Sequence, residues 1–539
     1  MTSFSSPAGS SHALFTTSEI RSIEVAHEKK FPKISLMQRA GTAVAKLALT
    51  LTTKRTGKQK SAAFLVLAGP GNNGGDAWVS AAALKKAGHR VTVIALGDHK
   101  FVNPAAKRAH ASFVRGKGII RKDIPKDEAF DLIIDGLFGI GLGRAPAGAF
   151  ANIIVRANEL RTSSEKEGRP EILAIDIPSG LVADTGVALG ETINADHTLT
   201  FLGYKPGLFT AQGKDHAGAV HLDMLGVGAS DEASGSGELL TAENVRILIP
   251  ARHHHSHKGT YGNVGIVGGA EGMVGAAVLA SRAALYMGPG KVFLGIVAKD
   301  GPTFDPLNPE VMVRKAEELV VEDGLAALAI GMGLGTDKAA PRLLSAVLGR
   351  QLPLVLDADA LNLLAGTPSL CSALSSRSAK SSTGAPSKGK NLQTPRQAWT
   401  FIMTPHPGEA ARLMNVSVTH LQADRVTSAL ALAKRFDGIV VLKGAGTIVA
   451  APDGRYFINT SGNPGMASGG MGDALSGMIA ALLAQGMGAL DAAKLAVYLH
   501  GAAADACMAH GMAPLGLTAS EVIFEARMLL NSGLEHADH

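Results

Sequence analysis

The chain has 539 residues, of which 46% are hydrophobic and 18% are charged. This length exceeds a single typical core and the composition is that of a globular protein, so we expect two or more folded domains. The net charge of +6 is mild and no basic stripe interleaved with aromatic residues occurs, which argues against nucleic-acid binding. No run of ~20 apolar residues predicts a membrane span. The Ser-rich N-terminus lacks a signal-peptide pattern and two cysteines cannot build a disulfide framework, so we expect a cytoplasmic protein.

The first half of the chain alternates short β-branched runs with helical stretches, which is typical of a parallel α/β sheet. A helical region at residues 18–50 precedes the first strand. Strands are predicted at residues 63–67, 91–96, 132–135, 172–177 and 198–202, with helices at 76–87 and 104–115.

A glycine-rich turn, Gly-Pro-Gly-Asn-Asn-Gly-Gly-Asp at residues 69–76, joins the first strand to the following helix. Such a turn can cradle a phosphate, although two asparagines interrupt the usual fingerprint of dinucleotide-binding folds. Asn72 and Asn73 add amide groups that can hold a cation or a polar ligand. The alternative is an ordinary turn between a strand and a helix.

Two aspartates follow later strands of this half. Asp135 begins the segment Asp-Gly-Leu-Phe-Gly-Ile-Gly-Leu-Gly-Arg, and Asp176 begins Asp-Ile-Pro-Ser-Gly. Ligands of open α/β sheets gather at the edge where such strands end. Asn73, Asp135 and Ser179 would then offer three oxygen ligands to a hard cation. Taken singly, strand-end aspartates also serve as helix caps.

These three segments resemble the epimerase domain of bifunctional NAD(P)H-hydrate repair enzymes. The resemblance implies a Rossmann-like, three-layer α/β/α domain over residues 14–228 that interconverts the epimers of hydrated NADH and NADPH. It implies potassium binding by Asn73, Asp135 and Ser179 and proton transfer by Asp176. Ala77 departs from the family, which commonly has glycine there, without removing a ligand. The implied substrate contacts are Asn72, Asn73, Gly74, Gly75, Asp76, Gly139, Ile140, Gly141, Leu142, Gly143, Arg144, Ala145 and Asp176.

A Gly/Ser-rich linker at residues 229–239 separates the two halves. The second half again alternates strands and helices. A segment rich in Ser, Lys, Gly and Pro at residues 372–396 interrupts it, and this composition predicts a mobile surface loop. Strands are predicted at residues 264–268, 292–296, 327–330, 354–357, 399–403, 439–442 and 447–450.

The densest motif of the chain is Asn-Thr-Ser-Gly-Asn-Pro-Gly-Met-Ala-Ser-Gly-Gly-Met-Gly-Asp, which ends at Asp473 and precedes an apolar helix. Its glycines bring backbone N–H groups close to a ligand, and the helix N-terminus adds partial positive charge, so the motif predicts a phosphate site. Asp473 would act there as a base toward an attacking hydroxyl, the alternative being an N-cap role. Upstream, Lys443 and its following glycines suit a nucleotide phosphate, and His406 lies between two prolines that stiffen its loop.

The series of loops from Lys258 to Glu521 resembles the ADP- or ATP-dependent NAD(P)H-hydrate dehydratase, a member of the ribokinase-like fold. The resemblance implies such a domain over residues 240–535. Met471 and Pro289 depart from the family but touch no implied polar contact. The implied nucleotide contacts are Lys443, Gly444, Ala445, Gly446, Thr447 and Gly472, and the implied contacts with the hydrated dinucleotide are Ala276, Gly335, His406 and Asp473.

Together the resemblances predict a bifunctional metabolite-repair enzyme. The second domain would use Asp473 to deprotonate the hydroxyl of the S hydrate as it attacks the terminal phosphate of ADP, with magnesium bridging the phosphates. Elimination of phosphate would restore the coenzyme and leave AMP. The residues leave open whether ADP or ATP is the donor and whether NADHX or NADPHX is preferred. Alanine-rich helical faces predict a homo-oligomer formed through the second domain.

Two other functions fit parts of this pattern. A kinase of small alcohols, such as a vitamin or sugar kinase, would use the second half alone, and a nucleotide-binding scaffold would bind without turnover. The Asn-Asn-Gly-Gly-Asp domain argues against the kinase, and the intact Asp473, Lys443 and Asp176 argue against the scaffold. The histidines at residues 253–257 point apart on an extended chain and lack a carboxylate or cysteine cluster, so we expect no metal there.

Overall fold

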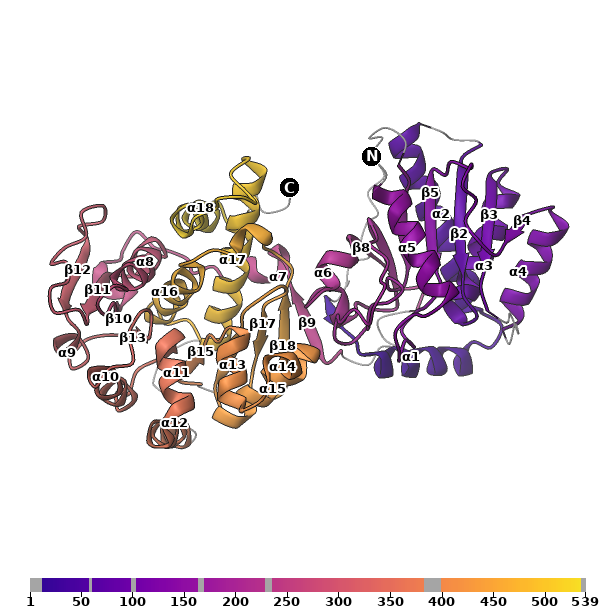
Figure 1. Ribbon diagram of the computed structural model, residues 1–539. Helices are drawn as coiled ribbons and strands as arrows, with labels where there is room; N and C mark the ends of the chain where they lie inside the picture. Colours follow the sequence, from indigo (N-terminus) through magenta and orange to yellow (C-terminus); the bar gives the residue numbers. More distant parts are fainter. Residues whose placement is uncertain are drawn as a thin grey trace. The chain divides into compact units, whose positions relative to one another are not determined.

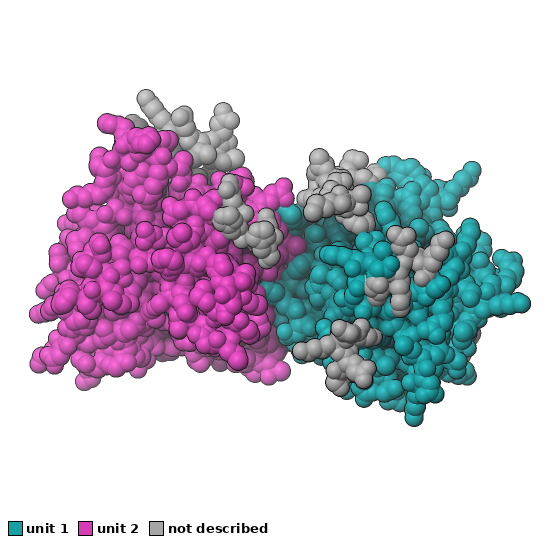
Figure 2. Space-filling view, turned by 90° about the horizontal axis from the view of Figure 1, so that it is seen from above, with its two compact units in different colours: residues 1–238 teal, residues 239–539 magenta. Residues whose placement is uncertain are grey.

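The computed structural model describes residues 12–57, 61–97, 103–162, 169–227, 235–381 and 399–534. The chain divides into unit 1 (residues 1–238) and unit 2 (residues 239–539), which are teal and magenta in Figure 2. Each unit has an α/β fold with parallel strands at its centre, as the alternation of strands and helices predicts (Figure 1).

Unit 1 is a three-layer α/β/α domain, which confirms the predicted fold. Its 7-stranded sheet has the order β4-β3-β2-β5-β6-β7-β8, and neighbouring strands are parallel. Phe64 and Val66 of β2 face one helical layer, whereas Leu65 and Leu67 face the other. The strands are β2 (Ala63–Ala68), β3 (Arg90–Ala95), β4 (Ile119–Arg121), β5 (Leu132–Gly136), β6 (Glu171–Ile175), β7 (His197–Phe201) and β8 (Ala219–Asp223).

The helices of unit 1 cover both faces of this sheet. Side chains of α1 to α4 pack with Phe64 and Val66, and side chains of α5 pack with Leu65 and Leu67. Because both faces are covered, the central strands are apolar on both sides. The helices are α1 (Thr17–Lys30), α2 (Leu36–Thr56), α3 (Asn72–Lys86), α4 (Pro104–Arg115), α5 (Ala149–Thr162) and α6 (Gly213–His216).

The end of the predicted linker is a strand rather than a flexible segment. Residues 228–234 lie outside the described residues, but Gly237–Leu240 form β9, whose first two residues pair antiparallel with β1 (Ala13–Leu14). Leu239 and Leu240 are buried. Burial of these two side chains outweighs the flexibility that the preceding glycines and serines predict.

The sheet of unit 2 continues from β9 in the order β9-β18-β17-β16-β15-β14-β13-β10-β11-β12. The strands from β16 to β12 pair in parallel, and β17 and β18 extend them in antiparallel fashion. The α/β class predicted for this half is confirmed. The strands are β10 (Asn263–Gly268), β11 (Lys291–Ile296), β12 (Val311–Lys315), β13 (Ala327–Ile330), β14 (Leu354–Leu356), β15 (Phe401–Met403), β16 (Ile439–Leu442), β17 (Ile448–Ala450) and β18 (Tyr456–Asn459).

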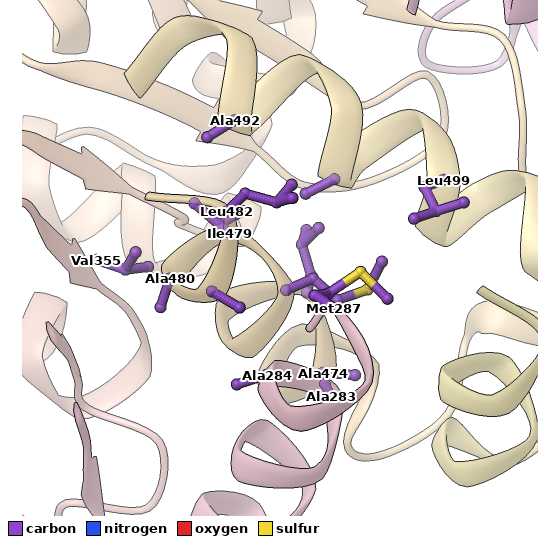
Figure 3. Packing of buried hydrophobic residues seen from close by; sticks show 14 of the residues in the cluster. Ala283, Ala284, Met287, Val355, Ala474, Ile479, Ala480, Leu482, Ala492 and Leu499 are labelled. Carbon is purple, nitrogen blue, oxygen red and sulfur yellow. The ribbon is translucent and has the colours of Figure 1, made fainter. Parts of the chain in front are cut away.

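The main core of unit 2 is built around α16, which lies between α8 and α17 (Figure 3). Its small side chains let the helices approach closely, and a Cβ at Gly477 of α16 would lie 2.0 Å from the carbonyl oxygen of Ala280 in α8. None of the helices in the described ranges has the length and apolar character that a membrane span requires. The helices are α7 (Ala242–Arg246), α8 (Val274–Tyr286), α9 (Ala316–Leu319), α10 (Ala339–Leu348), α11 (Ala358–Gly366), α12 (Pro368–Ser381), α13 (Pro407–Met414), α14 (Val418–Ala423), α15 (Arg425–Phe436), α16 (Met471–Ala484), α17 (Ala489–Ala509) and α18 (Ala519–Asn531).

The prediction of a surface loop at residues 372–396 is wrong in its first part. Residues 372–381 continue α12, in which Leu374 is 0% and Arg377 is 5% exposed. The guanidinium of Arg377 donates to the carbonyl oxygens of Arg350 and Leu352. Composition misled the prediction because one buried leucine and these hydrogen bonds suffice to pack an otherwise polar helix. Residues 382–396 lie outside the described residues.

Candidate active sites

The predicted loops of unit 1 meet at the carboxyl ends of β2, β5 and β6. The Asn-Asn-Gly-Gly-Asp segment forms the first turn of α3, which begins at Asn72 rather than at residue 76 as predicted. The N-cap residue, Gly71, has no side chain to accept a hydrogen bond from the first turn, so the N–H groups of this turn are left for a ligand. Glycine is required at Gly74 because a Cβ there would lie 1.8 Å from the carbonyl oxygen of Gly69.

Asn73, Asp135 and Ser179 come together around the backbone of Phe138. Asn73 Nδ2 donates to the carbonyl oxygens of Phe138 at 2.8 Å and Ile175 at 3.1 Å. Ser179 Oγ accepts from the Phe138 N–H at 2.9 Å and donates to Asp135 Oδ1 at 2.7 Å. Three side chains from α3, β5 and the loop after β6 therefore share one small polar centre.

Asp135 is a fully buried carboxylate that has no cationic partner in the described part of the chain. Its oxygens accept from the N–H groups of Ser179 at 2.8 Å and Leu137 at 3.2 Å. Burial raises the pKa of Asp135 to about 6, although these hydrogen bonds lower it. A buried negative charge beside the oxygens of Ser179 and Asn73 is the kind of all-oxygen set that a hard cation binds, so the residues fit potassium.

Asp176 is paired with a lysine that the sequence analysis did not single out. Lys205, beyond the end of β7, has a side chain that is 0% exposed, and its Nζ lies 2.5 Å from Asp176 Oδ1. The ammonium also donates to Thr200 Oγ1 at 2.9 Å and to the Phe201 carbonyl at 2.7 Å. A buried ammonium is costly without a counter-charge, and the carboxylate of Asp176 supplies that charge.

Two further carboxylates interact with Asp176. Burial raises the pKa of Asp76 well above its ordinary value, and the charges of Asp176 and Glu24 raise it further. Burial also raises the pKa of Glu24, with Asp176 as the next contribution. The site thus holds a carboxylate in an ion pair next to a carboxyl group whose pKa is raised, which is an arrangement suited to acid–base chemistry.

A cavity of about 440 Å³ connects these groups. Arg21 and Glu24 of α1 line it together with predicted residues. Gly74, Gly75 and Ala145 are predicted contacts that do not line it, and the two glycines instead face Gly69 and Met37. The predicted residues that do line it are Asn72, Asn73, Asp76, Gly139, Ile140, Gly141, Leu142, Gly143, Arg144 and Asp176.

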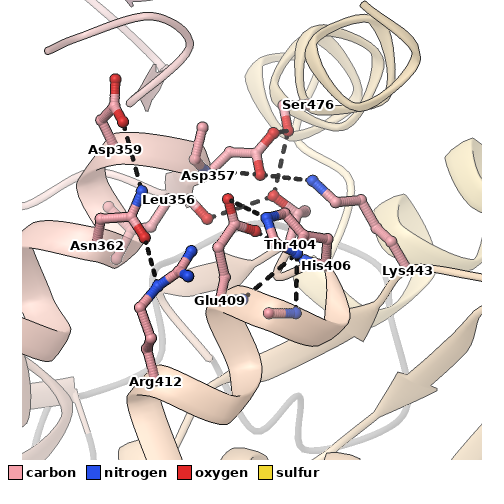
Figure 4. A network of polar contacts seen from close by, with 12 residues as sticks. Leu356, Asp357, Asp359, Asn362, Thr404, His406, Glu409, Arg412, Lys443 and Ser476 are labelled. Atoms are coloured by element: carbon pink, nitrogen blue, oxygen red, sulfur yellow. Dashed lines mark hydrogen bonds and ion pairs between the residues drawn. The ribbon is translucent and has the colours of Figure 1, made fainter. Parts of the chain in front are cut away.

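In unit 2, Asp357 is the centre of the polar network in Figure 4. This residue follows β14, and its side chain is 1% exposed. Its Oδ1 accepts from Lys443 Nζ at 2.8 Å and its Oδ2 accepts from Ser476 Oγ at 2.7 Å. Ser476 Oγ lies 3.2 Å from Thr404 Oγ1. The ends of β14, β15 and β16 are therefore tied to α16 at one point.

Lys443 reaches the first turn of α16, as expected for a nucleotide site. Burial opposes its charged form, but the negative charges of Asp357, Glu409 and Asp473 raise its pKa overall. A Cβ at Gly472 would lie 3.0 Å from Lys443 Nζ, so glycine at this position lets the ammonium approach the helix N-terminus.

Asp473 lies in the first turn of α16 and is not its N-cap, since Gly470 holds that position with a φ of 89°. The alternative N-cap role is therefore wrong. Within the described residues its carboxylate forms no hydrogen bond. Burial and the charge of Asp357 together raise the pKa of Asp473 to about 6, against the opposing effect of Lys443. A half-buried carboxylate in this state is available as a base.

His406 is held in one orientation as the N-cap of α13. Its ring Nδ1 accepts from the Gly408 N–H at 2.9 Å, and its backbone N–H donates to Glu409 Oε2 at 2.7 Å. Because Nδ1 accepts, the neutral ring carries its proton on Nε2. Burial lowers the pKa of His406, the charges of Lys443 and Arg412 lower it further, and that of Asp357 opposes them, so the neutral imidazole is favoured.

Arg425 supports the loop that follows Lys443. It is 1% exposed and donates to Gln422 Oε1 at 2.7 Å and to the Lys443 carbonyl at 3.2 Å. A Cβ at Gly444, where φ is 134°, would lie 3.0 Å from this guanidinium. Thr447 Oγ1 closes the loop by donating to the Gly444 carbonyl at 3.0 Å.

The two predicted contacts at Ala276 and Gly335 lie on segments that approach each other at Gly333. A Cβ at Gly333 would lie 3.3 Å from that of Ala276, and the Gly335 N–H donates to Asp359 Oδ2 at 2.8 Å. The charge of Asp359 raises the pKa of Asp473, which places this loop within electrostatic reach of the proposed base.

Several important residues were not predicted as site residues. Asp357 and Lys205 follow β14 and β7, so the rule that located Asp135 could have found them. Arg425 and Glu24 lie within helices and carry no local signal. No group of three or more His, Cys, Asp or Glu side chains in the described ranges has an arrangement suited to a metal ion.

Comparisons with known proteins cover both units. The family described as YjeF-related protein N-terminus matches residues 33–207, and the family described as NAD(P)H-hydrate dehydratase matches residues 264–381 and 384–525. The chain is 37% identical to the bifunctional NAD(P)H-hydrate repair enzyme Nnr of Escherichia coli (strain K12), over 88% of this chain and 86% of that protein. It is 36% identical to the enzyme of the same name from Vibrio cholerae, over 96% and 98% of the two chains.

A solved structure is also similar to unit 2. The crystal structure of ADP/ATP-dependent NAD(P)H-hydrate dehydratase from Bacillus subtilis, co-crystallised with ATP/Mg²⁺, is 32% identical with a TM-score of 0.46. The match covers 55% of this chain and 98% of that chain.

Proposed function

Because the chain belongs to the family of bifunctional NAD(P)H-hydrate repair enzymes, we propose that it restores hydrated NADH and NADPH. Unit 1 interconverts the R and S epimers of the hydrate, and unit 2 dehydrates the S epimer with ADP as phosphoryl donor. The observation that carries the proposal is Asp473, a carboxylate without a hydrogen bond in the described residues, next to Lys443 at the N-terminus of α16. The family matched over unit 2 favours this function over the alcohol kinase.

The dehydration proceeds through a phosphoester. Asp473 takes the proton of the substrate hydroxyl, whose oxygen attacks the terminal phosphorus of ADP while the bond to the bridging oxygen breaks and AMP leaves. Lys443 and the N–H groups around Gly472 stabilise the charge that develops on the phosphoryl oxygens. The carbon–oxygen bond then breaks, phosphate departs with the electron pair, and loss of a proton from the neighbouring carbon restores the double bond.

His406 supplies a neutral donor to this site. Its Nδ1 is used by the cap of α13, so the Nε2–H is the group that it offers to the hydrated dinucleotide. A neutral imidazole binds a polar group without adding positive charge beside Lys443. A charged imidazole would instead repel the Lys443 ammonium.

Epimerisation needs one proton acceptor and one proton donor. The hydroxyl of the hydrate is on the carbon next to the ring nitrogen, because protonation of an enamine leaves the cationic carbon there. Its configuration is inverted when the bond from this carbon to oxygen or nitrogen breaks and reforms. Asp176, paired with Lys205, is the acceptor, and Asp76, whose pKa is raised by burial and by two neighbouring carboxylates, is the donor.

Ions and assembly belong to the same proposal. Asn73, Asp135 and Ser179 hold a potassium ion that compensates the buried charge of Asp135. ADP enters unit 2 as its magnesium complex. Self-association through unit 2 and a cytoplasmic location remain predictions from the sequence.

The experiment that tests this function supplies the S hydrate of NADH with magnesium and either ADP or ATP, and follows absorbance at 340 nm together with the nucleotide products. We expect NADH to form with ADP in equal amount to AMP and phosphate, and no NADH to form with Asp473→Asn. Consumption of nucleotide with accumulation of a stable phosphoester of an added alcohol, and no gain of NADH, would instead identify the alcohol kinase.

A further inference from the structure

Helix α1 is a fixed wall of the unit 1 cavity. Its N-cap, Thr16, forms a capping box with Glu19, and the Thr17 N–H and Oγ1 donate to Asp184 Oδ1 at 2.7 Å and 3.0 Å. Ile20 and Ile23 are 2% and 4% exposed in the core of unit 1. The residues matched by the family begin at residue 33, after α1 ends at Lys30, so nothing in the match assigns a role to this helix.

Arg21 projects from α1 toward the glycine loop of the cavity. A Cβ at Gly141 would lie 3.5 Å from Nη2 of the Arg21 guanidinium, and both residues line the cavity. Arg144, at the other end of this glycine loop, also lines the cavity. Burial raises the pKa of Glu24 and the charge of Arg21 opposes this shift, but neither guanidinium uses its N–H groups in a hydrogen bond within the described residues. Beside a glycine-rich backbone, the two groups form a receptor for an oxyanion.

The charges along α1 also determine which way a ligand lies. One turn after Arg21, Glu24 interacts with Asp176, and Glu28 follows on the same face of the cavity. These carboxylates repel an anion, whereas Arg21 attracts it, so a phosphate is favoured only at the Arg21 end. An uncharged ring that must exchange protons then lies toward Glu24, Asp76 and Asp176.

We propose that Arg21 is a substrate-recognition residue that binds a phosphate of the hydrated dinucleotide and directs the reacting ring toward Asp176. This inference rests on the proposed epimerase function of unit 1. The phosphate is either the pyrophosphate, which both hydrates contain, or the 2′-phosphate, which only NADPHX contains. Arg21 does not touch the reacting atoms, so its loss weakens substrate binding and leaves the chemical step in place.

The test compares Arg21→Gln, Arg21→Lys and the control Arg108→Gln in the full chain. Arg108 is also the fifth residue of a unit 1 helix and is exposed, but it does not line the cavity. Epimerisation of R-NADHX and of R-NADPHX is measured separately, with KM and kcat for each. We expect Arg21→Gln to raise KM by about tenfold, because one charge-assisted hydrogen bond to the substrate is lost. Its kcat should stay within about threefold of wild type.

The two substrates distinguish the two phosphates. An equal rise in KM for both hydrates assigns Arg21 to the pyrophosphate, and a rise confined to R-NADPHX assigns it to the 2′-phosphate. Arg21→Lys should lie between Arg21→Gln and wild type, because it keeps the charge without the planar fork. Three outcomes would overturn the inference, provided that the wild-type chain is active. They are an unchanged KM of Arg21→Gln for both substrates, an effect of this variant on kcat alone, and an equal rise in KM for Arg108→Gln. An inactive wild-type chain would contradict the epimerase function itself.

Discussion

At the scale of single residues, both sites pair an aspartate that follows one strand with a lysine that follows another strand of the same sheet. Lys205 lies 2.5 Å from Asp176, and Lys443 lies 2.8 Å from Asp357. Each lysine is largely buried, so its charge is sustained by the partner carboxylate rather than by water. The difference is what the lysine faces: Lys205 supports a proposed acid–base residue, and Lys443 reaches a proposed phosphate site.

The first prediction concerns pH and Asp473. As a base it must be ionised, and its pKa is raised to about 6. The kcat/KM of dehydration should therefore be constant above this pH and fall tenfold for each unit below it. Initial rates with the S hydrate and ADP between pH 5 and 8 check this. A profile that stays flat down to pH 5 would contradict the assignment of Asp473 as the base.

The second prediction concerns the stability cost of the same carboxylate. Its pKa rises from an ordinary 3.8 to about 6 in the folded chain, so the folded state binds the proton more tightly. The free energy by which this carboxyl group stabilises the fold is fully present below pH 3.8 and is lost as pH rises through about 6. Asp473→Asn should thus stabilise unit 2 at pH 7.5 by on the order of 1 kcal/mol and have no effect near pH 4. Thermal melting at both pH values measures the difference, and destabilisation at pH 7.5 would refute it.

The third prediction concerns the Lys205–Asp176 pair. Lys205→Met leaves Asp176 as an unbalanced, largely buried charge and should destabilise unit 1 by about 3 kcal/mol. In the double variant Lys205→Met/Asp176→Asn, the loss should be smaller than the sum of the single losses, because no charge remains unpaired. Denaturant unfolding of the four proteins gives the coupling. Strictly additive losses would mean that the two residues do not depend on each other.

At the scale of elements, α16 both packs the core of unit 2 and carries Asp473. Its position is fixed by α8, whose backbone it touches at Gly477. A side chain at Gly477 would push the helices apart and displace the first turn that holds Asp473 and Gly472. Helix packing and catalysis in unit 2 are therefore coupled through one element.

The fourth prediction follows from this contact. Gly477→Leu should destabilise unit 2 by about 2 kcal/mol or more through overpacking, and should also lower the rate of dehydration. Gly275→Ala in α8 is the matched control, since a Cβ there meets nothing within 4 Å. Its effect on stability should stay within about 0.5 kcal/mol. Equal melting temperatures for the two variants would contradict the packing argument.

Sequence periodicity located most buried strands of the two sheets, but it missed the buried β18. Strands such as β5 and β13 are apolar runs that end at aspartate or glycine, so the pattern marked them within one residue. The half-exposed β12 and the exposed β4 have no such pattern and were not predicted. The start of α3 was placed too late because Asn and Gly are weak helix formers, whereas here close backbone packing at Gly74 fixes the helical turn.

The sites were predictable where residues follow strands. Asn73, Asp135 and Ser179 were predicted together and lie together, because parallel strands bring their ends to one edge. Arg21 and Arg425 lie within helices, and their roles depend on which loop the helix packs against. That information is tertiary and has no signature in the local sequence.

At the scale of the whole molecule, each unit contains the residues that we propose for its own reaction. The groups proposed for epimerisation lie between residues 21 and 205, and those proposed for dehydration lie between residues 276 and 476. One chain therefore holds two sites that share a substrate, and each should be removable without loss of the other.

The most direct test supplies the full chain with a mixture of R and S hydrates of NADH, together with ADP and magnesium, and follows absorbance at 340 nm to completion. Wild type should recover nearly all of the coenzyme. Asp176→Asn should recover, at the enzymatic rate, only the fraction that is present as the S epimer, and Asp473→Asn should recover none. Rapid complete recovery by Asp176→Asn, or any recovery by Asp473→Asn at the wild-type rate, would contradict the assignment of one reaction to each unit.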